Sequence, residues 1–360
     1  MQQAAKSRFP RLLGVSVLCV VLSLPALNLL VDPTEIFGSG LLPHRFQVND
    51  RYRKFEYLLT ECGDCTGFLL GSSRMGYTDP ALFDGLLRSG RTYNMNISSA
   101  NAWDYLEFAR FLESKGRHAE LLVVQLDLTE EFGDRGRYQH HPAVSGESRF
   151  RFFFENLFSL QYRSLLGKVW YNLAGRDSSG FDWATGRRSR EDADRALAAD
   201  AGAYVRDEPD FHVPADSRRP DPAEVALAVD RTVEAIRELK AHRDRTGTRL
   251  IVLVTPHNQH YLDRYRYQEL EQLLRGLATV TPFWNFAAYS SVTTDDRNFY
   301  ETSHYRPYVG EWVARRIVVG EAADVPEDFG RRVTARNLDR ELAAVRAGFD
   351  ARARTDRGGT

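Results

Sequence analysis

Residues 67–74 have the sequence Gly-Phe-Leu-Leu-Gly-Ser-Ser-Arg, in which a short apolar run ends at small polar residues. The run at 67–70 predicts a buried strand, and the small residues after it predict the turn that closes this strand. Ligands of open α/β sheets bind beyond the carboxyl ends of the strands. This turn is therefore a candidate position for catalytic or ligand-binding residues.

Apolar runs of similar length recur along the chain and alternate with helical patterns. They predict further strands at residues 91–97, 121–126, 250–254 and 280–286. The helical patterns cover residues 80–87, 103–115, 222–245 and 262–277. Strands that are apolar throughout, separated by helices, indicate a parallel sheet covered on both faces. We therefore predict a three-layer α/β domain.

The composition is that of a folded protein. Of 360 residues, 43% are hydrophobic and 27% are charged, which is enough apolar material for a large core. Lys and Arg number 48 against 49 Asp and Glu, so the chain lacks the basic excess of nucleic-acid-binding proteins. Three cysteines are too few for a scaffold built on disulfides.

The N-terminal region predicts a membrane anchor. Residues 12–31 carry no charge, and as a helix they span roughly 30 Å, the thickness of a bilayer core. Three basic residues precede them, so residues 1–11 are expected in the cytoplasm and the rest outside it. The alternative is a cleaved signal peptide, but Leu24-Pro25-Ala26 offers a large residue where cleavage needs a small one. We expect a single-pass protein of the bacterial inner membrane with its C-terminal domain on the periplasmic or extracellular side.

The exported part divides into an α/β domain at residues 45–330 and a C-terminal helical tail at 331–360. An insertion at about 130–221 interrupts the domain. Its aromatic-rich part, residues 149–173, predicts helices that pack on the domain, followed by a polar surface loop. The alternative is a lid, or a surface that meets a membrane partner.

Cys62 and Cys65 belong to the exported part, where an oxidising compartment favours a small structural disulfide. Reduced thiols or a redox-active pair are the alternatives, although redox pairs usually open a helix after a strand. A zinc site would need a second ligand pair at suitable spacing. We predict no metal and no cofactor.

Two distant segments carry the residues of a possible acyl-transfer site. A serine hydroxyl in the turn after the first strand, such as that of Ser73, is a weak nucleophile that needs a base. His304 can supply the base, and Glu301 can orient its imidazole from three residues earlier. The alternative for the serine turn is purely structural, since small residues suit such turns.

Four blocks of sequence resemble the SGNH/GDSL hydrolase superfamily, in particular its membrane-anchored exported branch. That branch includes the teichoic-acid D-alanine transfer protein and alginate O-acetylation proteins. The blocks are Phe68–Arg74, Asn94–Ala100, Val124–Asp127 and Phe299–Pro307. The resemblance covers about residues 66–330 without the insertion. It implies a flavodoxin-like sheet and acyl-ester chemistry on an exported substrate.

By this resemblance Ser73 matches the nucleophile, with Ser72 as the second choice, and His304 matches the base. Glu301 stands where the family usually has Asp. The extra methylene moves the carboxylate by roughly 1.5 Å, so the turn must adjust or another acid must help. Asp295 and Asp296 are the nearby alternatives.

The oxyanion hole implied by the resemblance consists of Ser73, Ser99 and Thr129. Ser99 stands where the superfamily commonly has glycine, and Thr129 falls near the place of its asparagine. A backbone N–H does not require glycine, so the role of Ser99 depends on the turn geometry.

Three further residues are candidates for binding substrate: Arg74, Asn96 and His257. Arg74 can hold a carboxylate through two hydrogen bonds, and a surface salt bridge is the alternative. His257 follows the strand at 250–254, and its alternative is to cap the helical region after it. Asn96 belongs to the second block.

These observations predict an exported, membrane-anchored serine O-acyltransferase or esterase that acts on a cell-envelope or secreted polysaccharide. Coenzyme A thioesters are not expected outside the cytoplasm, and the resemblance implies a multi-spanning membrane acyltransferase as the partner that delivers the acyl group. The alternative is a catalytically inactive envelope protein that binds glycan or scaffolds a polysaccharide assembly complex. The departures from the family pattern at Glu301, Ser99 and Thr129 keep this alternative open.

Overall fold

The computed structural model describes residues 2–39, 41, 42, 49–128, 141–160, 162–174 and 180–358. The chain forms two compact units, one of Met1–Leu59 with Arg135–Gly180 and one of Thr60–Asp134 with Phe181–Thr360. The expected α/β domain at 45–330, with its single insertion at about 130–221, differs from this division. Only residues 135–180 group with the N-terminal segment, whereas 181–221 belong to the unit that holds the sheet.

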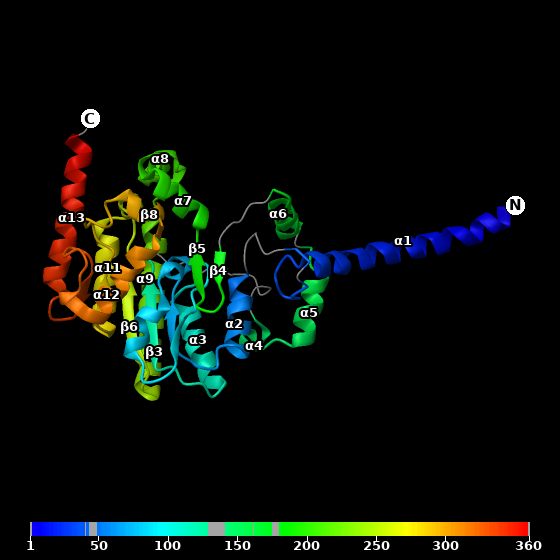
Figure 1. Cartoon of the computed structure of the whole chain (residues 1–360), viewed down its shortest axis with the longest axis horizontal. Coiled ribbons are helices and arrows are strands. Elements are labelled where there is room, and N and C mark those ends of the chain that lie inside the picture. Colours follow the sequence, from blue (N-terminus) through cyan, green and yellow to red (C-terminus); the bar gives the residue numbers. More distant parts are fainter. Residues whose placement is uncertain are drawn as a thin grey trace. The chain divides into compact units, whose positions relative to one another are not determined.

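The second unit contains a six-stranded sheet in the order β10-β7-β6-β3-β1-β2 (Figure 1). All neighbouring strands are parallel except β10, which runs antiparallel to β7. The strands are β1 Cys65–Leu70, β2 Arg91–Asn94, β3 Leu121–Leu126, β6 Arg249–Val254, β7 Phe283–Asn285 and β10 Arg331–Val333. The predicted α/β class with a mostly parallel sheet is confirmed.

The chain changes direction across the sheet at β1. It runs from β1 outward to β2 at one edge and then returns to β3 on the other side of β1. Loops that follow two such strands leave the sheet in opposite directions, which opens a place for ligands at the carboxyl ends of the strands. The turn after β1 and the loop after β3 meet at this point.

Helices cover both faces of the sheet. On one face the ring of Phe68 packs edge-on against Phe108 of α3 (Ala102–Ser114), with 5.0 Å between ring centroids. The neighbouring residue Leu69 points the other way, into a core cluster that includes Phe83 and Val309. The first face carries α3, α9 (Pro222–Thr246) and α11 (Tyr267–Val280), and the second carries α12 (Pro307–Val319) and the 3-10 helix η2 (Pro80–Leu86).

Local sequence explains where these helices begin and end. The Asn101 side chain accepts hydrogen bonds from the first turn of α3, and the Asp104 carboxylate accepts one from the N–H of Asn101. Asp221 caps α9, and Pro222 takes the first helical position, where no N–H is needed. Gly247 ends α9 at a φ of 75°, a conformation that glycine adopts without strain.

Two elements near the C-terminus were not predicted. Helix α12 begins at Pro307, and the strand β10 joins the sheet beyond the expected boundary at residue 330. Because β10 has three residues and two of them are exposed arginines, it has no apolar run that a sequence pattern could detect. The predicted C-terminal helix is present as α13, Leu338–Gly358.

The first unit begins with α1, Gln2–Val31, whose 22-residue segment Pro10–Val31 contains an 18-residue window with a mean hydropathy of 2.3. It is long and apolar enough to cross a membrane, although a signal sequence has the same properties. The aromatic-rich part of the insertion forms α4 (Pro142–Ser145), α5 (Arg149–Leu157) and α6 (Tyr162–Leu173) in the same unit. The prediction that this part is helical is confirmed.

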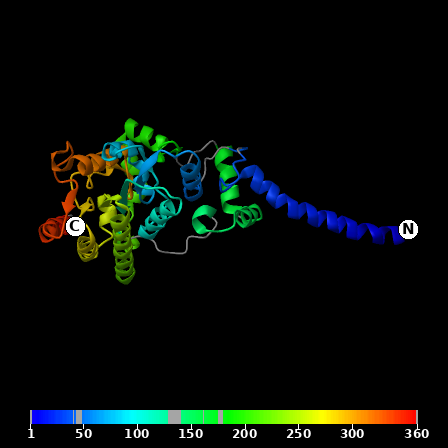
Figure 2. The ribbon, with the colours of Figure 1, turned by 90° about the horizontal axis from the view of Figure 1, so that it is seen from below.

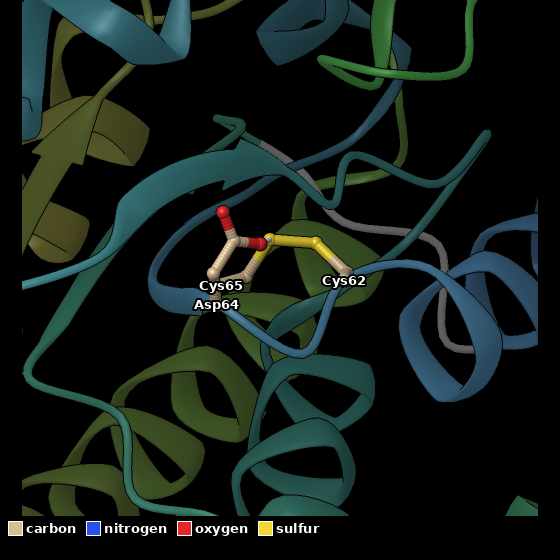
Figure 3. Close-up of side chains that lie close together, drawn as sticks. All are labelled: Cys62, Asp64 and Cys65. Atoms are coloured by element: carbon tan, nitrogen blue, oxygen red, sulfur yellow. Dashed lines mark hydrogen bonds between the residues drawn. A yellow bond between two sulfur atoms is a disulfide. The ribbon is translucent and has the colours of Figure 1, made fainter.

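Cys62 and Cys65, the first residue of β1, form a disulfide, as the sequence predicts (Figure 3). Both cysteines are buried, and Arg117 donates hydrogen bonds of 2.6 and 3.2 Å to their carbonyl oxygens. Asp64 lies beside the two sulfur atoms and completes a group of the size that binds metals. The sulfurs are bonded to each other, however, and a disulfide lacks the thiolates that zinc requires.

Candidate active site

Ser73 lies where the sequence places it, in the turn after β1. It is the first residue of a 3-10 helix, η1 (Ser73–Tyr77), so its N–H has no partner within that helix. Gly71 makes this turn possible, because a Cβ there would stand 2.5 Å from the Cβ of Met75 and 3.1 Å from that of Gln125. The chain can therefore approach β3 closely before it turns into η1.

His304 comes from a small hairpin formed by β8 (Phe299–Glu301) and β9 (His304–Tyr305). Glu301 and His304 are paired across this hairpin, with only two residues between them. The Oγ of Ser73 lies 2.7 Å from Nε2 of His304, although the two residues are 231 positions apart in sequence. This distance is that of a hydrogen bond between a nucleophile and its base.

Glu301 completes the arrangement, because its Oε1 contacts Nδ1 of His304. With the proton on Nδ1, the imidazole donates to the carboxylate and Nε2 is free to accept the proton of Ser73. Burial by itself raises the pKa of Glu301, but His304, Arg190 and the N–H of Ser303 outweigh it and hold the pKa well below its usual value. The carboxylate is thus charged across the neutral pH range.

Asp295 and Asp296, the alternative acids, have other partners. Asp295 forms an ion pair with Arg297. Asp296 accepts hydrogen bonds from Asn258 and Gln259 and lies 3.2 Å from the ring of His260. Glu301 is the carboxylate that contacts His304, and the close pairing of β8 with β9 accommodates its extra methylene.

Burial is the largest influence on His304 and lowers its pKa below the ordinary value of 6.5. The Glu301 carboxylate opposes this effect, and the charges of Arg190 and Arg74 add to it. The net result is an imidazole that is neutral at neutral pH. A neutral imidazole is the form that can remove a proton from a serine.

The hairpin is held from the sheet side by Tyr305. Its hydroxyl lies 2.9 Å from Oγ1 of Thr78 and accepts a hydrogen bond of 3.0 Å from Nε2 of Gln125 on β3. Arg74 adds a hydrogen bond from Nε to the carbonyl of Ser303, at 3.0 Å. All of these contacts fix His304 relative to the carboxyl ends of β1 and β3.

The hairpin is held from the other side by residues 187–210, which we call the arginine segment. It consists of β5 (Arg187–Ser189), α7 (Glu191–Ala199), α8 (Ala201–Asp207) and the start of η4 (Pro209–His212). Asp194 accepts a hydrogen bond of 2.8 Å from the hydroxyl of Tyr300, and Asp210 accepts hydrogen bonds from both the N–H and the hydroxyl of Thr302. The sequence indicated only a polar surface loop here.

Arg190 brings the arginine segment next to the candidate catalytic groups. Its Nε donates to the hydroxyl of Tyr77 at 2.8 Å, and its Nη2 lies 3.6 Å from Oε1 of Glu301. The ring of Tyr77 in turn meets the His304 ring edge-on, with 5.8 Å between centroids. Nothing in the local sequence distinguishes Arg190 from the other arginines of this stretch.

Arg74, a candidate for binding substrate, is already paired in the structure. It forms an ion pair with Asp127 at the end of β3, and its guanidinium lies 5.1 Å from the centroid of the Tyr261 ring. Burial opposes the charge of Arg74, but Asp127 outweighs this effect and raises the pKa of the guanidinium. The salt bridge named as the alternative is present, and it joins the loops after β1 and β3.

His257 is completely buried, and its ring stacks on that of Tyr261 with 4.3 Å between centroids. Neither ring nitrogen has a hydrogen-bond partner among the described residues. Burial, followed by the charge of Arg74, holds the pKa of His257 well below its usual value, so the ring is neutral. The expected alternative of a helix cap is wrong, because Asn258 caps α10 (Gln259–Leu262) through its own side chain.

The three residues expected at the oxyanion hole differ in whether the structure places them near Ser73 and His304. Ser73 offers the free N–H of the first turn of η1. Ser99 is exposed at a left-handed φ of 53°, and no contact of the described residues joins it to Ser73 or His304. Thr129 lies outside the described residues.

Asn96 and Ser72 lie close to the same turn but are turned inward. Asn96 is fully buried, and its amide nitrogen lies 3.0 Å from the point where a Cβ on Gly76 of η1 would stand. Ser72 is 3% exposed, and its hydroxyl has no hydrogen-bond partner among the described residues. Of the two serines, only Ser73 contacts His304.

No protein-family model matches this chain, and a search of curated proteins also finds no match.

Proposed function

We propose that the protein is a serine-dependent O-acyltransferase or esterase. The observation that carries this proposal is the chain of contacts from Ser73 through His304 to Glu301, with 2.7 Å between the serine oxygen and Nε2. A hydroxyl, a neutral imidazole and a charged carboxylate in this order are the parts of a nucleophilic triad. The neutral state of His304 and the charged state of Glu301 both favour this use.

In the proposed reaction His304 takes the proton of Ser73 through Nε2 while Oγ attacks the carbonyl carbon of an acyl ester. Glu301 stabilises the imidazolium that forms. The C–O bond of the donor then breaks, and His304 returns the proton to the departing alcohol, which leaves an acyl-Ser73 ester. An acceptor hydroxyl repeats the sequence in reverse and carries the acyl group away, with water as acceptor in an esterase and a sugar hydroxyl in a transferase.

The finer assignment is to the SGNH type with a flavodoxin-like sheet. Taken in chain order, the five parallel strands have the order 2-1-3-4-5, which is the order of flavodoxin-like sheets. The position of Ser73 after β1 and the Glu-x-x-His pair late in the domain support the same assignment.

We further propose that α1 remains attached as an anchor in the bacterial inner membrane, with the second unit on the periplasmic or extracellular side. The substrate is then a cell-envelope or secreted polysaccharide, and a multi-spanning membrane acyltransferase supplies the acyl group. An anchor raises the effective concentration of the domain near such a partner.

Turnover of a chromogenic acetyl ester by the full chain in detergent tests the proposal. Wild-type protein is expected to release the alcohol with saturation kinetics, and Ser73→Ala is expected to abolish the release. Addition of a candidate polysaccharide decides between water and sugar as acceptor, because a transferase shifts the acetyl group to the glycan. A folded wild-type chain with turnover no higher than that of Ser73→Ala contradicts the proposal and favours the scaffold alternative.

A further inference from the structure

The first unit exposes an apolar surface that the proposed acyl transfer does not use. It lies on α5, on α6 and on the short turn between them. The exposed apolar side chains in this stretch are Phe150, Phe154, Phe158, Leu160, Leu166, Trp170 and Leu173. We call this set the aromatic face.

The aromatic face follows helical spacing, so it is a property of whole helices. On α5, Phe150 and Phe154 are four residues apart, and Phe158 at its end continues the series. The rings of Phe150 and Phe154 stack with 6.0 Å between centroids, and those of Phe154 and Phe158 contact each other at a tilt with 4.7 Å between centroids. The opposite side of α5 is buried, with Phe152 only 1% exposed. Helix α5 therefore carries aromatic side chains on its buried side and also on the side that faces outward.

Helix α6 repeats this pattern. Leu166, Trp170 and Leu173 are spaced by four and three residues and are 61%, 64% and 80% exposed. Lys168, on the other side, is buried and donates a hydrogen bond of 2.6 Å to the carbonyl of Asp32, directly after α1. Lys168 thus points toward the protein, whereas Leu166, Trp170 and Leu173 face outward.

The end of α1 holds both helices in place. Asn28 is buried in the uncharged stretch of α1, residues 12–31, and its side-chain amide donates to the carbonyls of Leu157 and Ser159 at 2.8 and 3.0 Å. These carbonyls lie at the C-terminal end of α5, where the helix itself leaves them without partners. Asn28, which weakens α1 as a membrane helix, is thereby explained as the residue that fastens α5 to it.

The direction of the helices points to the partner. Figures 1 and 2 show α5 and α6 beside the C-terminal end of α1. The axes of both helices run across the axis of α1 rather than along it. If α1 crosses a bilayer, helices in this orientation lie in the plane of the bilayer at its surface. Exposed apolar residues of α1 in its last turns, Leu27 and Leu30, belong to the same end of the unit.

We propose that the aromatic face rests in the interfacial region of the lipid bilayer that α1 crosses. Rings of Phe and Trp suit this region, where apolar groups leave water while the polar Nε1 of Trp170 stays near the headgroups. The three observations that fix lipid as the occupant are the continuity of the face with α1, its in-plane helices and its aromatic composition. The proposal requires α1 to span the membrane, as proposed above, and is independent of the chemistry at Ser73.

Depth measurements on the full chain in phosphatidylcholine vesicles test this proposal. A thiol-reactive fluorophore is placed at Phe150→Cys or Leu166→Cys in a Cys19→Ser background, and lipids brominated at different positions along the acyl chain quench it. Both sites are exposed, so the substitutions leave the fold intact. The expected label depth at both sites is about 5–10 Å into the headgroup and acyl boundary, as for interfacial helices.

Two matched positions calibrate the result. The native Cys19, exposed on α1, reports whether α1 lies within the bilayer. Leu227→Cys on α9, an exposed apolar position of the second unit, gives the value for a site in water. The proposal is overturned if labels at positions 150 and 166 are quenched no more than the label at Leu227→Cys, while the label at Cys19 is strongly quenched. In that case the aromatic face would bind an integral membrane protein rather than lipid. Because Ser73 reactivity is measured separately, failure here does not affect the acyl-transfer proposal.

Discussion

The strand-end loops and the arginine segment both hold the hairpin that carries His304, but they do so with different chemistry. The turn after β1 supplies the proposed nucleophile Ser73, and the buried side chains of Thr78 and of Gln125 on β3 anchor Tyr305. The arginine segment supplies Arg190, Asp194 and Asp210, which reach the hairpin from half-exposed positions. The proposed bond-making groups thus come from the sheet and its hairpin, whereas an insertion adds charged groups that position them.

This difference predicts a hierarchy of effects. Substitution of a residue in the proton path removes a chemical step. Substitution in the arginine segment leaves the path in place and changes only its geometry and its pKa.

Ser73→Ala is expected to lower kcat for ester turnover by at least about 10³-fold, because Ser73 supplies the hydroxyl at Nε2 of His304, whereas the hydroxyl of Ser303 lies at Nδ1 on the other side of the ring. Steady-state assays with a chromogenic ester measure the loss. Ser72→Ala is the matched control, since its hydroxyl has no partner among the described residues and its loss should leave turnover nearly unchanged. Equal losses in both variants would place the nucleophile outside the turn after β1.

Glu301→Gln is expected to lower kcat by roughly 10²- to 10⁴-fold, because the amide cannot stabilise the imidazolium and favours the wrong tautomer of His304. Asp296→Asn is its control, because Asp296 bonds to Asn258 and Gln259 rather than to His304. A larger loss for Asp296→Asn than for Glu301→Gln would show that the hairpin acid has been misidentified.

The pH profile separates positioning from chemistry. His304 must be neutral to act as a base, and its lowered pKa predicts that kcat/KM falls only when the pH drops below the ordinary value of 6.5. Arg190→Gln removes a positive charge that lowers this pKa, so the acid limb should move to higher pH. The same variant should lose up to about 10²-fold in activity through misplacement of His304. If Arg190→Gln loses activity but the acid limb of the pH profile does not shift, Arg190 has only a structural role.

A matched pair of variants compares the two anchors of the hairpin. Tyr305→Phe leaves the buried side chain of Gln125 without its acceptor and should cost about 1–3 kcal/mol of unfolding free energy. Asp210→Asn weakens the hydrogen bonds to Thr302, which are partly exposed, and should cost about 1 kcal/mol. Urea unfolding measures both values. If Asp210→Asn has no effect, the arginine segment is only a surface loop, as the sequence indicated.

Sequence patterns were sufficient to predict those strands and turns that are determined by short, contiguous stretches of residues. The strands β1, β3 and β6 are continuous apolar runs, and the turn after β1 consists of small residues that only tight turns favour. Ser73, Glu301 and His304 could be named because each stands beside a strand or within a short hairpin. Their meeting at 2.7 Å is a consequence of strand order, which brings the ends of distant segments to one edge of the sheet.

The features that the sequence did not predict depend on contacts between distant segments, which no local sequence pattern encodes. Arg190 is one of several arginines in a polar stretch, and only the packing of α7 and α8 on the hairpin selects it. The prediction that residues 149–173 are helical was confirmed, but their outward-facing aromatic side could be recognised only once Asn28 and Lys168 showed which side faces α1. The polar strand β10 was missed for the same reason, since its residues become a strand only through pairing with β7.

The proposed transfer of an acyl group through Ser73 is tested most directly by trapping the intermediate. The full chain is incubated with an activated acetyl ester, quenched in acid, digested and mapped by mass spectrometry. We predict one acetyl adduct, on Ser73, which persists in Ser72→Ala and is absent from His304→Ala. A folded wild-type chain with Ser73 unmodified, or an adduct that forms equally well without His304, would contradict the account.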